Sequence, residues 1–450
     1  MREKAKPFEP GDIKDFSISS NSKNFSIDIS PSVVEFRYFE SVLSNTITAT
    51  AVVTDTGVQE GSKIGEGSII DALPIRGGER TDIIIEDNEG NELALELFVN
   101  RVRNSSPGTQ NEIFFIDFSS REYFANEQFR VVKRYKDAPI STHVSDITKA
   151  MGISNIDIDE TAGNYNFYGN DRKPFYICTW LASKSIPQIE SEDGKPATGG
   201  SAGYFFYQTR EGFHFKSIDK IFQGEPTKKY IYNNNPKLPE GYDAKVLTYD
   251  IESDIDLHEK LMLGTYNNRS IYFDFLAMNY VVQNYSLEPP EQSISPTGTG
   301  NVETKDKITP AGKQIDKLVA KEFLKSPSRL MCHLLDVGTL PNGVSPEEQL
   351  EHWRENKDKP NFKAVETMQA SIMRYNQLFT IKTNITIPGD FSLKAGDIVQ
   401  CDFPELSGSP TKEINPESRG IYMISSVCHK VTPGSSLTSL SLVRDSYGKK

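Results

Sequence analysis

The chain has 450 residues, too many for a single hydrophobic core, so we expect two to four domains. Its composition is that of a folded soluble protein, with 37% hydrophobic, 10% aromatic and 25% charged residues. The 62 acidic residues outnumber the 50 basic ones and give a formal net charge of −12, which argues against a protein that wraps nucleic acid on a basic surface. Acidic walls repel phosphate, so nucleic acid could still pass nearby without sticking.

The four cysteines, Cys178, Cys332, Cys401 and Cys428, are too sparse for a disulfide scaffold and predict reduced, buried thiols. The polar residues 1–22 predict a flexible arm and lack the apolar core of a secretory signal. No apolar run approaches the length of a membrane span. We therefore expect the chain to fold in a cytoplasm, without membrane insertion.

A first β module is predicted over 23–134. Thr46–Val53 (TITATAVV) alternates threonines on one face with apolar residues on the other, as a half-buried strand does. Thr81–Glu86 and Glu92–Val99 predict a hairpin, because the five residues between them tolerate positive φ angles. Glu112–Phe118 predicts a further strand.

The pattern changes over 135–225, where helical and strand-like segments alternate. Thr142–Met151 and Pro174–Ser183 carry apolar residues at helical spacing, and the proline suits a first helical turn. Tyr204–Gln208 and Gly212–Lys216 predict a hairpin. This part of the chain therefore predicts a small α/β domain inserted after the first β module.

A second β module is predicted in two pieces, 226–290 and 376–450. In the first piece, Leu261–Tyr266 and Ser270–Phe275 predict a hairpin that turns at Asn267-Asn268. The second piece predicts four strands between turn signals: Thr380–Ile387, Asp397–Phe403, Gly420–Val431 and Leu437–Val443.

Between these pieces, 291–375 predicts a linker followed by helices. Ser293–Lys307 is polar and flexible in composition, and residues 308–378 carry apolar residues at helical spacing. The sequence thus predicts an α+β fold dominated by β structure, with an α/β insert after the first module and a helical insert within the second.

Two glycine-containing patterns are candidates for catalytic or phosphate-binding motifs. Gly199–Gly203 (GGSAG) fits the GxSxG pattern of a serine nucleophile elbow, which needs a strand before it and a helix after it. A loop precedes it and a strand-like segment follows, so a flexible loop is favoured. Gly65–Ser68 and Thr297–Gly300 lack the third glycine and the lysine of phosphate-binding loops and predict turns.

Two Cys-His dipeptides, Cys332-His333 and Cys428-His429, are candidate metal ligands. Neighbouring residues on a strand point to opposite faces, so both side chains of a dipeptide cannot reach one ion. No CxxC or HExxH pattern supplies the remaining ligands. Ordinary core or surface residues are the favoured interpretation.

Acidic and aromatic clusters are the remaining candidates for catalytic or ligand-binding sites. Carboxylates such as Asp157 with Asp159, or Asp254 with Asp256, could serve glycoside hydrolysis, but a solvated acidic surface is commoner. The aromatic run Tyr204–Tyr207 could be a sugar or base platform, but packing in the core is favoured. We predict no catalytic, cofactor-binding or metal-binding residue.

Three stretches carry a resemblance to a known family: Ile29–Gly57 (ISPSVVEFRYFESVLSNTITATAVVTDTG), the segment from Ser120 (SREYF…VVKRYKDAPISTHVSDITKAMGI) and Ala395–Asp445 (AGDIVQCDF…GIYMISSVCHKV…TSLSLVRD). They resemble the baseplate hub family of contractile-tailed phages, which includes the N-terminal part of type VI secretion spike proteins. The resemblance implies that each β module is a tube-type antiparallel β-barrel.

The resemblance also implies a function in assembly. A homotrimer would place six barrels in a pseudo-sixfold ring that joins the tail tube to the central spike and lets the genome pass. The implied partners are further copies of the chain, the tail tube protein, the spike protein, the baseplate wedge proteins and the tape-measure protein. Genomic DNA would pass without specific binding, so we expect acidic or neutral side chains in the lumen. The implied location is the baseplate of the virion tail, after assembly in the host cytoplasm.

Two other functions remain open at this point. The chain could be a tail-associated peptidoglycan hydrolase with its active site in 291–375, although that segment shows no convincing acid pair. It could also be a glycan- or receptor-binding tail protein, although such proteins more often show repetitive β sequence.

Overall fold

The computed structural model describes most of the chain outside the region between 287 and 380. The described residues are 11–21, 25–57, 69–107, 111–190, 196–197, 203–233, 237–253, 258, 262–263, 267–274, 278–286, 327, 329–334, 371–372, 374–375, 378–379, 381–404, 414–415 and 418–444. Among them, no helix has the length and apolar character needed to cross a membrane.

The first β module is an uninterrupted piece of chain. Its strands are β1 (Asp12–Ser19), β2 (Ser26–Asp28), β3 (Val33–Ser41), β4 (Thr48–Asp55), β5 (Arg80–Glu86), β6 (Glu92–Pro107) and β7 (Glu112–Ser119), with a 3-10 turn at Ser30–Ser32 and a short helix α1 (Ile69–Ala72). They pair in the order β3-β4-β7-β6-β5-β1-β2. Alternate residues point inward, and Phe16 meets Phe36 and Phe118 in the core at centroid distances of 5.7 and 5.8 Å. The strands and hairpin predicted here are confirmed.

The predicted flexible arm over 1–22 is wrong for Asp12–Ser19, which form β1. This strand pairs antiparallel with β5, and its Phe16 and Ile18 are fully buried. The alternation of two apolar residues is too short to stand out among polar neighbours. β1 forms because it pairs with β5, a strand more than sixty residues later in the chain. The local sequence gives no sign of that pairing.

The second β module is assembled from two distant pieces of the chain. Its strands are β15 (Lys228–Ile231), β16 (Ala244–Lys245), β17 (Thr248–Ser253), β21 (Ile381–Pro388), β22 (Ile398–Asp402), β23 (Gly420–Thr432) and β24 (Ser435–Arg444). Tyr230 and Val246 from the first piece share one core with Ile385, Val399 and Leu442 from the second. The four C-terminal strands predicted from the sequence are confirmed, each within two residues at either end.

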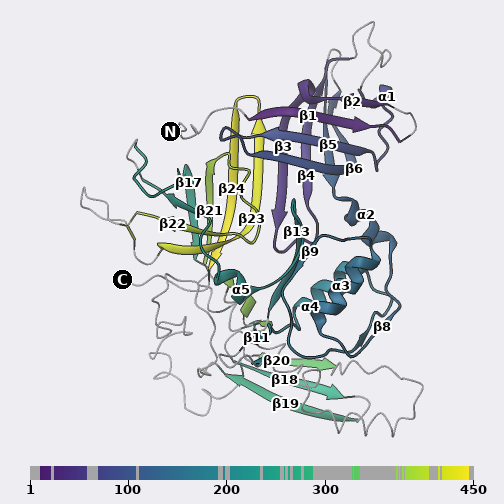
Figure 1. The fold of residues 1–450 in the computed structure, drawn as a ribbon, viewed down its shortest axis with the longest axis vertical. Coiled ribbons are helices and arrows are strands. Elements are labelled where there is room, and N and C mark those ends of the chain that lie inside the picture. The colour runs from purple at the N-terminus through teal and green to yellow at the C-terminus, as the bar shows by residue number, and fades with distance from the viewer. Residues whose placement is uncertain are drawn as a thin grey trace.

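The two modules are joined edge to edge through β23. Its first residues pair with β22, whereas Ser426–Val431 pair with β3 of the first module. An irregularity at Ser425 separates the two stretches, and the Ser425 carbonyl accepts the Val42 N–H at 2.9 Å. The result is one sheet of 14 strands, which Figure 1 shows as the purple-blue and the yellow-green halves side by side. Within the described strands this sheet follows an open path, so closed barrels stay a prediction.

The α/β insert lies below the first module in Figure 1. Its elements are α2 (Arg121–Gln128), β8 (Arg134–Tyr135), α3 (Ile140–Ala150), β9 (Ile156–Ile158), β10 (Phe167–Tyr168), α4 (Pro174–Ala182), β11 (Ile189–Glu190), β12 (Pro196–Ala197), β13 (Tyr204–Thr209), β14 (Gly212–Ser217) and α5 (Ile218–Phe222). The two predicted helices and the predicted hairpin are confirmed. The helix α2 was not predicted, because it is short and has no buried side chain. The parallel pairing of β9 with β14 was also not predicted.

A separate sheet of three strands lies at the bottom of Figure 1. It contains β18 (Asn267–Asp274), β19 (Asn279–Ser286) and β20 (Arg329–Leu334), in the order β19-β18-β20. The hairpin predicted around Asn267-Asn268 is wrong, since these residues lie inside β18 and the chain reverses after Asp274. The helical prediction over 308–378 is wrong for β20, whose parallel pairing with β18 overrides its local pattern. The remaining predicted helices there lie mostly outside the described residues.

Candidate assembly site

One face of the joined sheet carries short polar side chains from both modules, and we call it the hydroxyl face. It crosses eight strands in the order β17-β21-β24-β23-β3-β4-β7-β6. Residues directly opposite one another on antiparallel strands share a face. One row of such partners runs Thr248, Thr386, Ser439, Cys428, Phe39, Thr48, Ser119 and Phe98. No member of this row is charged.

A groove of about 520 Å³ lies over the hydroxyl face, at the seam between the modules. Nine of its eighteen lining residues are serine or threonine, and its two charged lining residues, Glu40 and Asp250, are both acidic. Within it, the Ser441 hydroxyl donates to Oδ1 of Asn384 at 2.8 Å. A surface of this composition can hydrogen-bond water and offers no cation to a phosphate.

Two basic residues beside this groove share one acidic partner on the same face. Arg37 of β3 and Lys430 of β23 both contact Glu35, at 2.5 and 2.8 Å. Partial burial opposes ionisation of Glu35, but the hydrogen bonds from Lys430 and Arg37 outweigh it and lower the pKa of that carboxyl. The shared carboxylate therefore offsets one of the two positive charges and ties β3 to β23.

A buried carboxylate, Glu40, holds three parts of the chain together beneath this seam. Its side chain is at the end of β3 and is 2% exposed. Oε1 accepts the Tyr38 hydroxyl and the Arg210 N–H, each at 2.8 Å, and Oε2 accepts the Ala395 N–H at 2.9 Å. Arg210 is in the turn between β13 and β14, and Ala395 is in the loop between β21 and β22. Burial raises the pKa of Glu40, against the effect of the hydrogen bonds from Ala395 and Arg210.

The loop over 389–397, which we call the junction loop, is held by the tip of the α/β insert. The Arg210 guanidinium donates to the carbonyls of Phe391 and Ser392, and Lys394 forms an ion pair with Glu211. The Phe391 ring is fully buried and belongs to the core of the first module, although the loop belongs to the second. The junction loop therefore contacts all three parts of the fold.

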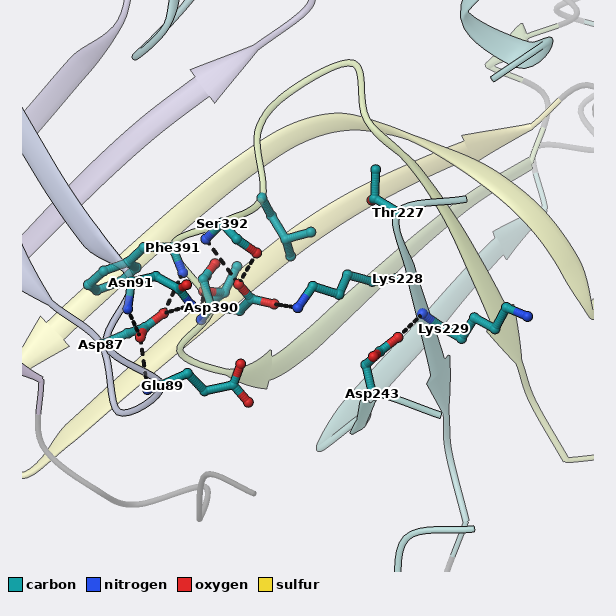
Figure 2. Close-up of polar contacts among 12 residues, drawn as sticks. Asp87, Glu89, Asn91, Thr227, Lys228, Lys229, Asp243, Asp390, Phe391 and Ser392 are labelled. Atoms are coloured by element: carbon teal, nitrogen blue, oxygen red, sulfur yellow. Dashed lines mark hydrogen bonds and ion pairs between the residues drawn. The ribbon is translucent and has the colours of Figure 1, made fainter. Parts of the chain in front are cut away.

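Two aspartates fix the other side of the junction loop, as Figure 2 shows. Oδ1 of Asp87, in the turn between β5 and β6, accepts the Asn91 N–H at 2.8 Å, and its Oδ2 accepts the Phe391 N–H at 2.9 Å. Asp390 accepts the Ser392 N–H at 3.0 Å and lies 3.4 Å from Nζ of Lys228 on β15. Each carboxylate thus shapes its own turn and contacts a second segment.

His429 packs under the junction loop as a neutral residue. Its ring stacks on Tyr38 and meets Phe391 edge to face at 5.1 Å, and Nδ1 lies 3.0 Å from the Thr438 hydroxyl. Complete burial lowers the pKa of His429 to about 4, and the nearby Arg210 charge contributes. In the same loop, burial raises the pKa of Asp397 to about 6.

Several predicted candidate residues lie within the described part of the chain, some on opposite faces of a strand and some in ion pairs. Cys428 is partly exposed on the hydroxyl face and His429 is buried on the opposite face, as predicted for neighbouring residues of a strand. In the described part of the chain, no three His, Cys, Asp or Glu side chains are placed to hold a metal. Lys216 contacts Asp157 at 2.6 Å and Asp159 at 3.4 Å, so these carboxylates are ion-paired.

The predicted aromatic core is confirmed. These six side chains are all less than 5% exposed: Tyr204, Phe205, Phe206, Tyr207, Phe213 and Phe215. Four predicted features lie outside the described residues, apart from Gly203: the Gly199–Gly203 motif, the two glycine turns at Gly65–Ser68 and Thr297–Gly300, and the pair Asp254 and Asp256.

Sequence reasoning missed the residues that hold the junction: Glu40, Asp87, Asp390 and Phe391. Glu40 carried a signal, because it occupies an inward position of an alternating strand, where a carboxylate needs partners. Phe391 carried a weaker one, as a large apolar residue in a Pro-Gly-Asp turn. Their partners could not be named from sequence, since they come from distant segments.

Comparisons with known proteins identify the fold. No family model and no curated protein matches the sequence. A tail protein from Neisseria meningitidis MC58 superposes with a TM-score of 0.53 at 9% identity, over 96% of each chain. The 43 kDa tail protein of prophage MuSo2 from Shewanella oneidensis gives a TM-score of 0.47 at 10% identity, over 96% of this chain and 98% of the other. At 9% identity the likeness to the Neisseria protein shows a shared fold, so the chain folds as that tail protein does along nearly its whole length.

Proposed function

We propose that the chain is a structural hub protein of a contractile phage tail baseplate, in which three copies form a pseudo-sixfold ring between tail tube and spike. One observation carries the proposal: two β modules are joined edge to edge and present a single face of eight strands, four from each module. The likeness to a tail protein along nearly the whole chain supports it.

The arrangement of strands suits a subunit that adapts threefold to sixfold symmetry. A trimer can offer six similar units only if each copy supplies two of them in a fixed relation. Here the relation is fixed by the β23–β3 pairing and by the Glu40 hydrogen bonds, so the modules cannot rotate freely against each other. Three copies would supply six four-stranded units to one ring.

The hydroxyl face is the surface that would line the channel. Its central row is uncharged, its groove has no basic lining residue, and Arg37 and Lys430 are paired with Glu35. A polyanion such as DNA meets no cation in this groove or along this row and can pass there without binding. The tail tube, spike, wedge and tape-measure proteins are the partners that this position implies, and the virion baseplate is the location.

Mass measurement of the purified full chain tests the proposal. Light scattering after size exclusion should give the mass of three chains, and electron micrographs of that fraction should show rings with a central channel. Obligate interfaces of this kind bury roughly 2,000 Å² or more, so the trimer should persist at micromolar concentration. A monomer at every concentration that also cleaves peptidoglycan would overturn the proposal in favour of the tail-associated hydrolase.

A further inference from the structure

The α/β insert carries a basic surface with exposed apolar side chains, which we call the insert patch. It consists of residues 129–136 (FRVVKRYK), which include β8, together with Arg172 and Tyr176. The two parts lie side by side, because the Val131 N–H donates to the Arg172 carbonyl at 2.9 Å. The Arg172 guanidinium in turn lies 5.4 Å from the centre of the Tyr176 ring. Figure 1 shows β8 at the right-hand margin of the insert, on the side away from the second β module.

The charge of the insert patch differs from that of the surface around it. Residues 129–136 include four basic and no acidic side chains, although the whole chain has a net charge of −12. Exposed arginines of the first module, such as Arg80 and Arg103, contact carboxylates at 2.9 and 2.7 Å. Beside the patch, Lys173 also pairs with Glu127. In contrast, four cations of the patch form no ion pair with any residue that the structure describes: Arg130, Lys133, Lys136 and Arg172.

Three large apolar side chains of the patch are exposed. Phe129 is 50% exposed, Val132 62% and Tyr176 53%. Their chain neighbours Tyr135 and Phe175 are buried in the core of the insert, so that core forms without these three side chains. Exposed apolar side chains beside arginines are typical of protein–protein contacts, in which Phe, Tyr and Arg are enriched.

We propose that the insert patch binds an acidic segment of another protein, whose own apolar side chains cover Phe129, Val132 and Tyr176. Attraction between the opposite charges would orient the segment, and burial of the apolar side chains would supply most of the affinity. A nucleic acid fits this surface less well. Its phosphates would leave the apolar side chains uncovered, and the exposed carboxylates of Glu127 and Asp171 at the border of the patch would repel them. The patch is on a single chain, so this inference goes beyond the ring and does not depend on it.

Fluorescence anisotropy with the full chain tests the proposal. The probe is a short labelled peptide that alternates glutamate with leucine. It is compared with the same peptide carrying serine in place of leucine, and with single-stranded DNA of equal length. The leucine peptide should bind roughly tenfold more tightly than either, because it alone complements both the cations and the apolar side chains.

Two pairs of substitutions separate the contributions of charge and apolar contact. Lys133→Glu with Lys136→Glu should raise the dissociation constant of the leucine peptide roughly tenfold or more, because like charges then face each other. Phe129→Ser with Val132→Ser should also weaken binding, but should leave its dependence on salt concentration unchanged.

The matched control is a charge reversal at two exposed positions of the second β module, Lys229→Glu with Lys237→Glu, which should leave peptide binding unchanged. Circular dichroism and urea unfolding show whether each variant folds.

Three outcomes would overturn the proposal. Tighter binding of DNA than of the leucine peptide would make the patch a nucleic-acid surface. Equal peptide binding by the native chain and the Lys133→Glu, Lys136→Glu variant would place the peptide elsewhere. No binding of the leucine peptide to the native chain would show that acidic and apolar groups together are not what the patch recognises. Each of these results leaves the proposed trimer standing, because that is tested by mass and not by peptide binding.

Discussion

Both β modules have a packed hydrophobic core, but the first is built from one continuous segment of the chain and the second from two separate segments. The first is a single run of chain from β1 to β7, whereas the second collects strands from before and after the residues between 254 and 380. Their seam joins residues that are distant in the chain, such as Ser41 and Ser425, which are 384 positions apart. All strand pairings within the first module therefore lie in its own segment, although Phe391 and Val431 of the second module complete its core. The second module and the seam depend on contacts between segments that are distant in the chain. Buried polar groups fix how those segments align.

Removal of the Glu40 carboxylate is the change that should damage the seam most. Glu40→Ala leaves the Tyr38 hydroxyl and the Arg210 and Ala395 N–H groups without their acceptor in a buried site. We expect the free energy of unfolding to fall by about 4 kcal/mol. Urea unfolding measures this, with Glu92→Ala on the exposed side of the first module as the control, expected within about 0.5 kcal/mol.

Two further observations would sharpen or contradict that expectation. Glu40→Gln keeps one oxygen as an acceptor and should cost about half as much as Glu40→Ala. Equal stability of Glu40→Ala and the native chain would show that the modules hold together without this carboxylate.

The seam should also make stability depend on pH through His429. Its pKa is about 4 in the folded chain and about 6.5 in the unfolded chain, so acid favours the unfolded state. The stabilising effect of the neutral ring is complete above pH 6.5 and is lost as the pH falls towards 4, by about 3 kcal/mol. His429→Gln should show a correspondingly shallower loss of stability over this range in urea titrations.

Asp397 acts in the opposite direction within the same pH range. Its pKa of about 6 in the folded chain lies above its unfolded value, so its contribution to stability falls as the pH rises towards 6. This contribution is common to the native chain and His429→Gln, so the difference between their two curves isolates the histidine. Parallel curves for the two proteins would contradict the assignment of a neutral His429.

A smaller loss is expected at the turn of the first module that contacts the junction loop. Asp87→Ala removes the acceptor for the Asn91 and Phe391 N–H groups, and we expect the free energy of unfolding to fall by about 2 kcal/mol. Asp87→Asn keeps one oxygen and should lose less. If Asp87→Ala unfolds at the same urea concentration as the native chain, the contact with Phe391 does not stabilise the seam.

The same contrast explains how far the sequence predicts the fold. The hairpin β5–β6 and the four C-terminal strands could be predicted because turn residues and alternation are local signals. β1 and β20 could not, because each is fixed by a partner strand distant in the chain. The hydroxyl face was visible only in part, as the threonines of Thr46–Val53. Its continuity across both modules depends on the β23–β3 register, which no local pattern encodes.

The hydroxyl face should tolerate changes that the buried seam does not, and this is the smallest expected effect on stability. Thr48→Lys with Ser439→Lys places two cations on the face, and both positions are exposed. We expect the free energy of unfolding to change by less than about 1 kcal/mol.

Because the cations would lie on the surface proposed to line the channel, the variant should retain double-stranded DNA in a low-salt mobility assay, whereas the native chain should not. The matched control, Thr142→Lys with Ser154→Lys, adds the same charge on the exposed surface of the α/β insert. Equal retention by both variants would show that net charge, rather than the hydroxyl face, decides whether DNA binds.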